Sequence, residues 1–351
     1  MREPACWMIE NYGYRRCRRP QREFRYAISL HNHSSYSVEN LASLNQVVKL
    51  WFMQPLKGTL QRAFGLEHIS GLNYTDLKYN PPLSPEEVYR MEAEALAPYG
   101  FDGLHLAITD HDEYAGSLEL CERRPDLNGR VAVGEELTVR FDGHVFHLGI
   151  SGIEAASAAE THARLQETAR EGRLDDMFEA LRATRCLVVF NHPLIPWGPG
   201  GQSHIPAREL LARYGWAIHA LEYNGMRRRE ENDRVLELAR QWRKPVVGGG
   251  DSHLLRASAA LCVSPSANFR DFVGEVQGGR SVALVKDEYF APLRWKLFLR
   301  VLYFMANYRR IASFQGQPVA EMLARRCVLL DPLGLASRAF LAVSAGLRLN
   351  R

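Results

Sequence analysis

The fold is first indicated by the stretch Tyr26-Ala27-Ile28-Ser29-Leu30-His31-Asn32-His33. Its first five residues form a short apolar run, typical of a buried strand, and two histidines separated by one residue follow directly. Because alternate side chains of an extended chain point the same way, both imidazoles can reach one ion. The stretch therefore predicts a strand that ends at a metal site.

Six further strand-like runs follow, and they alternate with segments of helical period. The expected strands cover residues 26–30, 104–109, 130–138, 145–150, 186–190, 217–222 and 245–248. Helices are expected at 85–98, where Ser84 and Glu87 form a capping box, and at 174–184, 207–214 and 230–242. This alternation favours the α/β class, with β/α units around a mostly parallel sheet or barrel.

Three segments depart from the alternation. Residues 1–25 hold seven arginines and are expected to be a basic N-terminal extension. Residues 41–83 form an insertion after the first strand, with a helical start at 44–54. Residues 285–351 are expected to form a basic helical C-terminal extension, which carries ten Lys/Arg and two acids from residue 291 onward. Its apolar stripe beside basic residues would suit a membrane surface, and its basic residues a nucleic-acid contact, but packing of the stripe onto the core of the chain is favoured.

The composition limits the class of protein. With 351 residues, of which 46% are hydrophobic, the chain can bury a sizeable core, which excludes disorder and fibrous repeats. Its 44 basic residues barely exceed its 40 acidic ones, which is unlike a dedicated nucleic-acid binder. Six cysteines without a Cys-x-x-Cys pair fit neither a disulfide framework nor a zinc ribbon. We expect a reduced, cytoplasmic protein without a secretory signal or a spanning helix.

Side chains of metal-ligand type lie in or directly after each expected strand. They are His31, His33, Asp110, His111, Glu135, Glu136, His147, Asn191, His192, Glu222, Asn224, Asp251 and His253. Because the carboxyl ends of barrel strands converge on one mouth, these side chains can meet there. Imidazoles and carboxylates without thiolates suit Zn, Mn or Fe, and more than four ligands indicate more than one ion.

The order of these motifs is H-x-H, T-D-H, G-x-E, H, N-H-P, E-x-N and G-x-D-S-H, and it resembles that of the PHP (polymerase and histidinol phosphatase) family. The resemblance covers about residues 26–284, apart from the insertion. It implies a distorted seven-stranded (β/α) barrel that holds two or three divalent ions and hydrolyses phosphoesters.

The resemblance also implies which residues bind each ion. One ion would be held by His31, His33, Glu136 and Asp251. Glu136 would bridge to a second ion, completed by His147 and His192. A third ion would be held by His111 and His253.

Three positions leave alternatives open. Family members commonly have Ser-Asp-Gly soon after the H-x-H, whereas this chain has Ser37-Val38-Glu39-Asn40; Val38 cannot bind a metal, and Glu39 substitutes only if the backbone shifts by one residue. His147 is favoured over His144 as the ligand of its strand. The G-x-E spacing favours Glu136 over Glu135.

The expected reaction is hydrolysis of a phosphate mono- or diester, in a small molecule, nucleotide or oligonucleotide, by a hydroxide held between two ions. Asp110 and Glu222 are candidates for the general acid or for orienting histidine ligands. Asn191, Asn224 and Arg227 are candidates for substrate binding. Two alternatives remain: an amide or ester hydrolase with the same centre, and a non-catalytic binding module stabilised by metal.

Overall fold

The computed structural model describes residues 6–10, 13–40, 78–194, 205–252 and 259–292, together with 295–296, 298–299, 313–314 and 317–318. The expected helix at 44–54, the candidate ligand His253 and most of the C-terminal extension lie outside the described residues.

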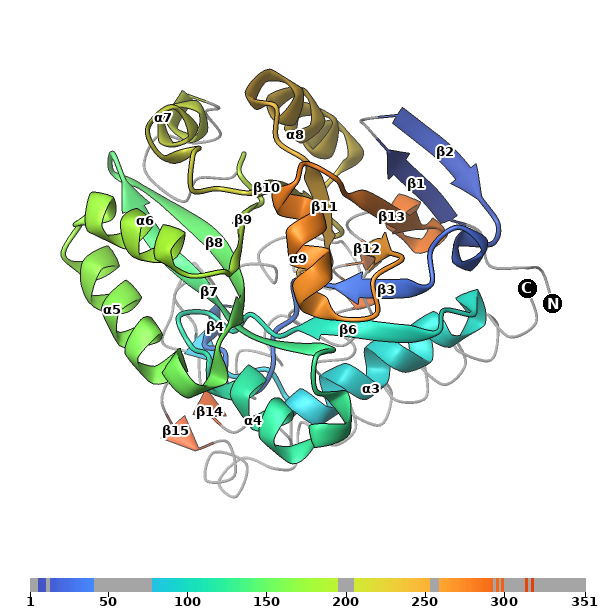
Figure 1. Cartoon of the computed structure of the whole chain (residues 1–351), viewed down its shortest axis with the longest axis horizontal. Coiled ribbons are helices and arrows are strands. Elements are labelled where there is room, and N and C mark those ends of the chain that lie inside the picture. The colour runs from blue at the N-terminus through green and yellow to red at the C-terminus, as the bar shows by residue number, and fades with distance from the viewer. Residues whose placement is uncertain are drawn as a thin grey trace, which may run out of the picture.

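A large mixed sheet of eleven strands occupies the centre of the structure, and helices surround it (Figure 1). The strands β9, β10 and β11 run parallel to one another, as do β3, β6 and β7, and the remaining neighbours are antiparallel. The α/β class is therefore confirmed. In spatial order the strands are β11 (Val246–Gly249), β10 (Ala220–Asn224), β9 (Leu187–Asn191), β8 (His144–Ile153), β7 (Val131–Phe141), β6 (Gly103–Ala107), β3 (Tyr26–Ser29), β12 (Ala260–Ser264), β13 (Val282–Lys286), β1 (Cys6–Glu10) and β2 (Gly13–Cys17).

Each expected strand coincides with an observed one to within a few residues. The strand β8 differs in direction, because it turns back from β7 as a hairpin instead of following a helix. Its early residue His147 lies opposite Thr138 of β7 and Asn191 of β9. The reversal thus brings His147 to the edge where the parallel strands end.

Seven α-helices are described, and the capping box predicted for Ser84 and Glu87 is present. The expected helices match α3, α6, α7 and α8, whereas α4, α5 and α9 were not predicted. The helices are α3 (Pro85–Leu96), α4 (Ala115–Arg123), α5 (Ala158–Arg170), α6 (Leu174–Ala183), α7 (Ile205–Tyr214), α8 (Arg229–Trp242) and α9 (Phe269–Gln277).

One end of the curled sheet is closed by α9. Its residues Phe269, Phe272 and Val276 pack with inward-facing side chains such as Ile28 and Val247 in one buried apolar cluster. The helix lies at the ends where strands begin, since Phe269 N–H bonds to the carbonyl just before β7 and the Gln277 side chain bonds to the carbonyl just before β9. The opposite end, where the parallel strands finish, carries the polar site.

Two smaller features frame this core. The N-terminal residues, expected as an extension, form the hairpin β1–β2 at the sheet edge. A second sheet joins β4 (Glu39–Asn40) and β5 (Lys78–Tyr79), which bracket most of the expected insertion, to β14 (Ser313–Phe314) and β15 (Gln317–Pro318). Among the described residues, no helix has the length and apolar character needed to cross a bilayer.

Candidate metal centre

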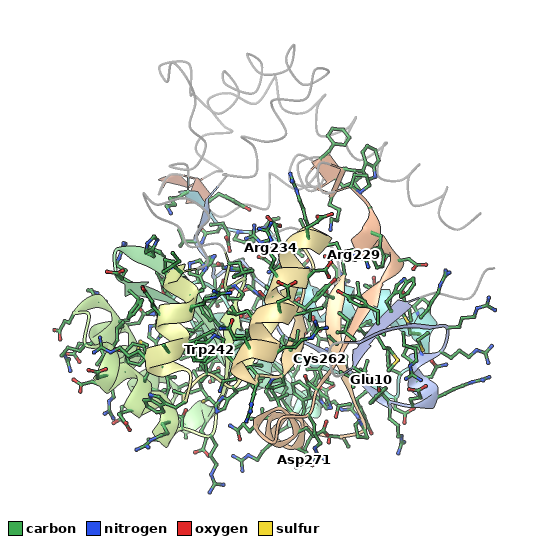
Figure 2. All side chains as sticks on the ribbon, turned by 90° about the horizontal axis from the view of Figure 1, so that it is seen from above. Glu10, Arg229, Arg234, Trp242, Cys262 and Asp271 are labelled. Carbon is green, nitrogen blue, oxygen red and sulfur yellow. The ribbon has the colours of Figure 1, made fainter. Side chains whose placement is uncertain are left out.

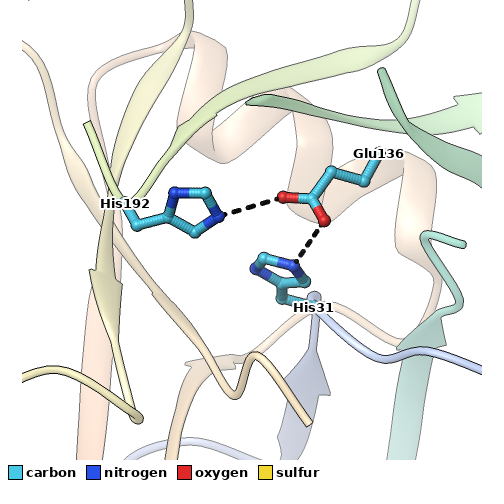
Figure 3. Close-up of side chains that lie close together, drawn as sticks. All are labelled: His31, Glu136 and His192. Carbon is cyan, nitrogen blue, oxygen red and sulfur yellow. Dashed lines mark ion pairs between the residues drawn. The ribbon is translucent and has the colours of Figure 1, made fainter. Parts of the chain in front are cut away.

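The site is built around the carboxylate of Glu136, which β7 directs into the curled sheet and which is fully buried. Its Oε2 lies 3.2 Å from His31 Nε2, 3.4 Å from His33 Nε2 and 3.2 Å from His111 Nδ1. Figure 3 shows His31 and His192 each reaching a different oxygen of Glu136. Three histidines from two strand ends therefore converge on one oxygen.

The other oxygen of Glu136 has its own set of neighbours. Oε1 lies 3.2 Å from His192 Nε2 and 3.4 Å from His147 Nδ1, and it accepts a 2.9 Å hydrogen bond from Asn191 Nδ2. His147, rather than His144, is the histidine of β8 that reaches Glu136. Five imidazoles and one amide thus surround a single buried carboxylate.

The arrangement fits divalent ions. Four groups of three ligand-type side chains have nitrogen or oxygen atoms within 4.8 Å of one another. Within the described structure, Glu136 Oε2 and His147 Nδ1 are buried yet make no hydrogen bond, so their lone pairs suit a cation. The groups are His31–Glu136–His192, His31–His33–Asp251, His33–Glu39–His111 and His111–Glu136–His147.

Glu39 belongs to one of these groups, although the sequence left its position open. Its carboxylate lies 3.3 Å from His33 Nδ1 and 3.4 Å from His111 Nε2, and it is only 3% exposed. The side chain of Val38 points outward and is 53% exposed. The strand β4 therefore carries Glu39 to the place where the sequence pattern lacks an aspartate or histidine.

Glu222 at the end of β10 touches two candidate ligands. Its Oε1 lies 2.6 Å from His31 Nδ1, and its Oε2 accepts the backbone N–H of His192 at 2.8 Å. Gly249 packs against this carboxylate, and only a residue without a side chain fits there, because a Cβ would lie 1.9 Å from Glu222 Oε1. The contact to Nδ1 orients the His31 ring so that Nε2 faces Glu136.

Asp251 follows β11 and completes the group with His31 and His33. Asn224 Nδ2 donates hydrogen bonds both to Asp251 Oδ2 at 3.1 Å and to Glu222 Oε2 at 2.9 Å. Both Asp251 and His192 have positive φ angles, 49° and 29°, in a region that non-glycine residues seldom adopt. Such backbone strain concentrates at functional sites.

Asp110 lies beside the centre but faces the loop after β3. Its carboxylate accepts the Ser34 backbone N–H at 2.5 Å and the Ser34 hydroxyl at 2.7 Å. Burial raises the pKa of Asp110 to about 7, although the bonds from Ser34 oppose this. These contacts anchor the loop that follows the H-x-H motif.

The charges inside the site shift one another's protonation. Burial alone would lower the pKa of His31, but the Glu136 and Glu222 carboxylates outweigh it and hold that pKa well above its usual value. The pKa of His111 rises to about 10 because Glu39 and Glu136 likewise overcome burial. Burial opposes the charged form of Glu136, yet the surrounding imidazoles hold its pKa well below the usual range.

Some polar residues of this region were not singled out by the sequence. Glu135 points to the other face of β7, where His162 Nδ1 lies 2.9 Å from its Oε2. Ser37 Oγ bonds to Glu39 Oε1 at 2.5 Å and accepts the His111 N–H at 3.1 Å. No local motif marks His162, because only the fold brings it to Glu135, whereas Ser37 stands in the stretch after the H-x-H motif but was given no role.

No family model matches the chain, and no curated protein matches it in sequence. Among solved structures, it is similar to a protein of Bifidobacterium adolescentis described as a metal-dependent phosphoesterase, with 17% identity and a TM-score of 0.35 over 56% of this chain and 91% of that one. It is also similar to a Chromobacterium violaceum amidohydrolase, solved with bound sulfate and no metal, with 17% identity and a TM-score of 0.40 over 64% and 87% of the two chains.

A third solved structure is a two-domain protein of Bacteroides vulgatus, described as containing a predicted PHP-like metal-dependent phosphoesterase. The identity is 14% and the TM-score 0.43, over 73% of this chain and 64% of that one. The order of motifs in this chain resembles that of the PHP family, and two of these three solved structures are described as metal-dependent or PHP-like phosphoesterases.

Proposed function

We propose that the protein is a metal-dependent phosphoesterase that hydrolyses a phosphate mono- or diester. The observation that carries this proposal is the convergence of five imidazoles on the two oxygens of Glu136. A carboxylate shared in this way suits a bridge between two ions, which is the arrangement used in two-metal hydrolysis of phosphoesters.

The proposed ligands divide among three positions. His31, His33, Glu136 and Asp251 would hold the first ion, and Glu136, His147 and His192 the second. Glu39 and His111 would contribute to a third position, together with the predicted ligand His253. Divalent Zn, Mn or Fe bound here would supply an activated water and positive charge for the phosphoryl oxygens.

The other side chains would act on the ligands or on the substrate. Glu222, Asn191 and Asn224 hydrogen-bond to candidate ligands, so we assign them to orienting His31, Glu136 and Asp251. Asp110, which is engaged by Ser34, would anchor the loop rather than donate a proton.

Arg227 is proposed to bind the phosphate. Its Nη2 lies 3.9 Å from Asp251 Oδ2, and its side chain is 24% exposed, so the guanidinium is both near the centre and accessible. Its Nε is buried and, within the described residues, makes no hydrogen bond. A guanidinium that has an unused N–H donor and lies beside a metal site is suited to donating hydrogen bonds to a phosphoryl oxygen.

Metal content and substrate preference test the proposal together. Metals in the purified protein would be counted by mass spectrometry, and hydrolysis of p-nitrophenyl phosphate, its bis-ester and p-nitrophenyl acetate would be followed with and without added Mn. We expect at least two ions per chain and metal-dependent cleavage of a phosphoester, which Asp251→Asn abolishes in a soluble protein.

Two other results would contradict it. Cleavage of the acetate alone would favour the amide or ester hydrolase, because an activated water can also attack a carbonyl. Fewer than one ion after reconstitution, without any turnover, would favour the non-catalytic binding module.

A further inference from the structure

The N-terminal hairpin presents a concentrated positive surface on a chain whose body is acidic. Residues 1–25 carry seven arginines and three acids, whereas residues 26–290 carry 27 basic and 35 acidic residues. A cavity of about 450 Å³ lies along the hairpin, lined by Arg15, Arg16, Cys17, Arg18, Arg19, Arg22 and Glu23. Five guanidinium groups around one cavity form an anion-binding surface.

Not all of these arginines are neutralised within the fold. Arg15 pairs with Glu10 and Glu23. In the part of the chain that the structure describes, Arg18 and Arg22 make no ion pair, and both are exposed. Their charge is available to a partner.

Aromatic rings accompany the arginines. The guanidinium of Arg16 lies 5.7 Å from the Trp7 ring centroid, and Trp7 meets Phe290 edge to face at 5.9 Å. Phe290 is 42% exposed and Tyr14, two residues before Arg16 on β2, is 36% exposed. Accessible rings next to guanidinium groups are the combination on which unpaired bases stack.

The basic surface continues to the metal centre through contacts of α8. Tyr14 donates a 2.7 Å hydrogen bond to Asp233, and Arg229 lies 5.5 Å from its ring centroid. Figure 2 labels Arg229 at one end of α8 and Trp242 at the other, and Figure 1 shows the helix next to the hairpin. From Arg229 the chain leads directly back to Arg227, which reaches Asp251.

We define the arginine track as Arg22, Arg19, Arg18, Arg16, Arg229, Arg228 and Arg227. Carboxylates also border it, because Glu230, Glu231 and Asp233 lie in the first turns of α8 and Arg229 pairs with Asp233 at 3.7 Å. Even so, the track places seven guanidinium groups in one series that ends beside a candidate metal ligand.

A simpler role exists for part of the track. The strand β2 lies at the edge of the large sheet, and charged residues on an edge strand prevent pairing with other chains. That role accounts for Arg16 and its neighbours on β2. It does not account for the accessible rings, or for the series continuing through α8 to Asp251.

We propose that the arginine track binds single-stranded nucleic acid and leads its phosphodiester backbone to the metal centre. This inference rests on the proposed phosphoesterase function and narrows its substrate to a phosphodiester polymer. Guanidinium groups would contact successive phosphates, and the exposed rings of Tyr14 and Phe290 would stack on the bases.

Binding is tested with a fluorescent oligothymidylate of about 15 nucleotides, by anisotropy at several salt concentrations. The variant Arg16→Gln/Arg18→Gln removes two charges without breaking an ion pair in the described structure. We expect roughly tenfold weaker binding and a salt slope smaller by about 1.4, because two phosphate contacts, each worth about 0.7 on a single strand, are lost. The matched control is Arg164→Gln/Arg170→Gln, which removes two exposed charges from α5 on the far side of the molecule (Figure 1) and should change neither quantity.

Hydrolysis separates this inference from the proposed function. With Mn, the double variant should cleave bis(p-nitrophenyl) phosphate like the parent protein but show a raised KM for the oligonucleotide. If the parent binds the oligonucleotide through the track but cleaves neither substrate, the binding surface stands and the phosphoesterase proposal fails. The inference is overturned if the double variant binds as the parent does, or if the parent binds phosphatidylserine vesicles but not the oligonucleotide.

Discussion

The central position of Glu136 can be tested against its own neighbour in the chain. Glu135 and Glu136 are both fully buried and adjacent on β7, but their side chains point to opposite faces of the sheet. Glu136→Gln removes a negative charge from among five imidazoles, whereas Glu135→Gln removes one that faces His162. The two substitutions are chemically identical, so a difference in metal binding reports on the site.

The distances give the expected size of the effect. Glu136 Oε2 lies 3.2 Å from His31 Nε2. At that separation, the Coulomb attraction between unit charges is about 5 kcal/mol at an effective dielectric constant of about 20. A divalent ion held by the same nitrogens would lose at least this much when the carboxylate becomes an amide. We therefore expect Glu136→Gln to weaken binding of each bridged ion by roughly 10³-fold or more.

Calorimetric titration of the metal-free protein with Mn or Zn measures the affinity, and turnover of bis(p-nitrophenyl) phosphate measures activity. Glu136→Gln should lose two ions and nearly all turnover, while Glu135→Gln should keep both. His111→Ala, which touches only one oxygen of Glu136 and the group with Glu39, should cost less activity than Glu136→Gln. Equal losses in Glu136→Gln and Glu135→Gln, or retention of both ions in Glu136→Gln, would refute the bridging role.

Four further substitutions test the residues that support the site and the stability of the fold. Glu222→Gln removes the charged partner of His31 Nδ1, so the titrated metal affinity should fall about 10–100-fold with little change in melting temperature; an unchanged affinity would contradict an orienting role. Gly249→Ala should lower the free energy of unfolding in urea, because its new Cβ would collide with the Glu222 carboxylate. The control is Gly274→Ala on α9, where a Cβ would have no atom within 4 Å; it should leave the free energy of unfolding unchanged or raise it by about 0.5–1 kcal/mol. Burial lowers the pKa of His219 to about 4, so between pH 6.5 and pH 4 the imidazole takes up a proton mainly in the unfolded chain. The free energy of unfolding should therefore fall by about 2–3 kcal/mol over that range. His219→Gln should remove this part of the pH dependence of stability.

The sequence predicted the strands that carry the site because each has both an apolar run and a polar end. His31, Asp110 and Asp251 directly follow such runs, and the rule that parallel strands finish at one edge was enough to group them. The resemblance to the PHP family, rather than this rule, favoured His147 over His144 and Glu136 over Glu135, and His147 Nδ1 lies 3.4 Å from Glu136 Oε1.

The remaining features depend on contacts that no local pattern encodes. Several strands pair with residues far away in the chain: β12 pairs with β3, and β1 of the N-terminal hairpin pairs with β13. No neighbouring residues therefore indicate where these strands lie in the sheet. The direction of β8 is the exception, because it follows from a local signal, the tight Asp142-Gly143 turn that connects β8 to β7 as a hairpin. Glu39 reaches His33 and His111 because β4 pairs with β5, on the other side of the expected insertion.

The buried charges link folding, protonation and ion binding in this site. Glu39, Glu136, Glu222 and Asp251 place four carboxylates in one buried region, and such a concentration requires compensating positive charge. In the chain alone, these carboxylates raise the pKa of His31 and of His111 despite burial, which favours protonated imidazoles as the source of that charge. Because a metal requires the neutral imidazole, ions and protons compete for the same nitrogens. The carboxylates that would bind divalent ions therefore also favour protonated imidazoles in the metal-free protein, which lets the site fold without metal. Metal binding should then release those protons to solvent.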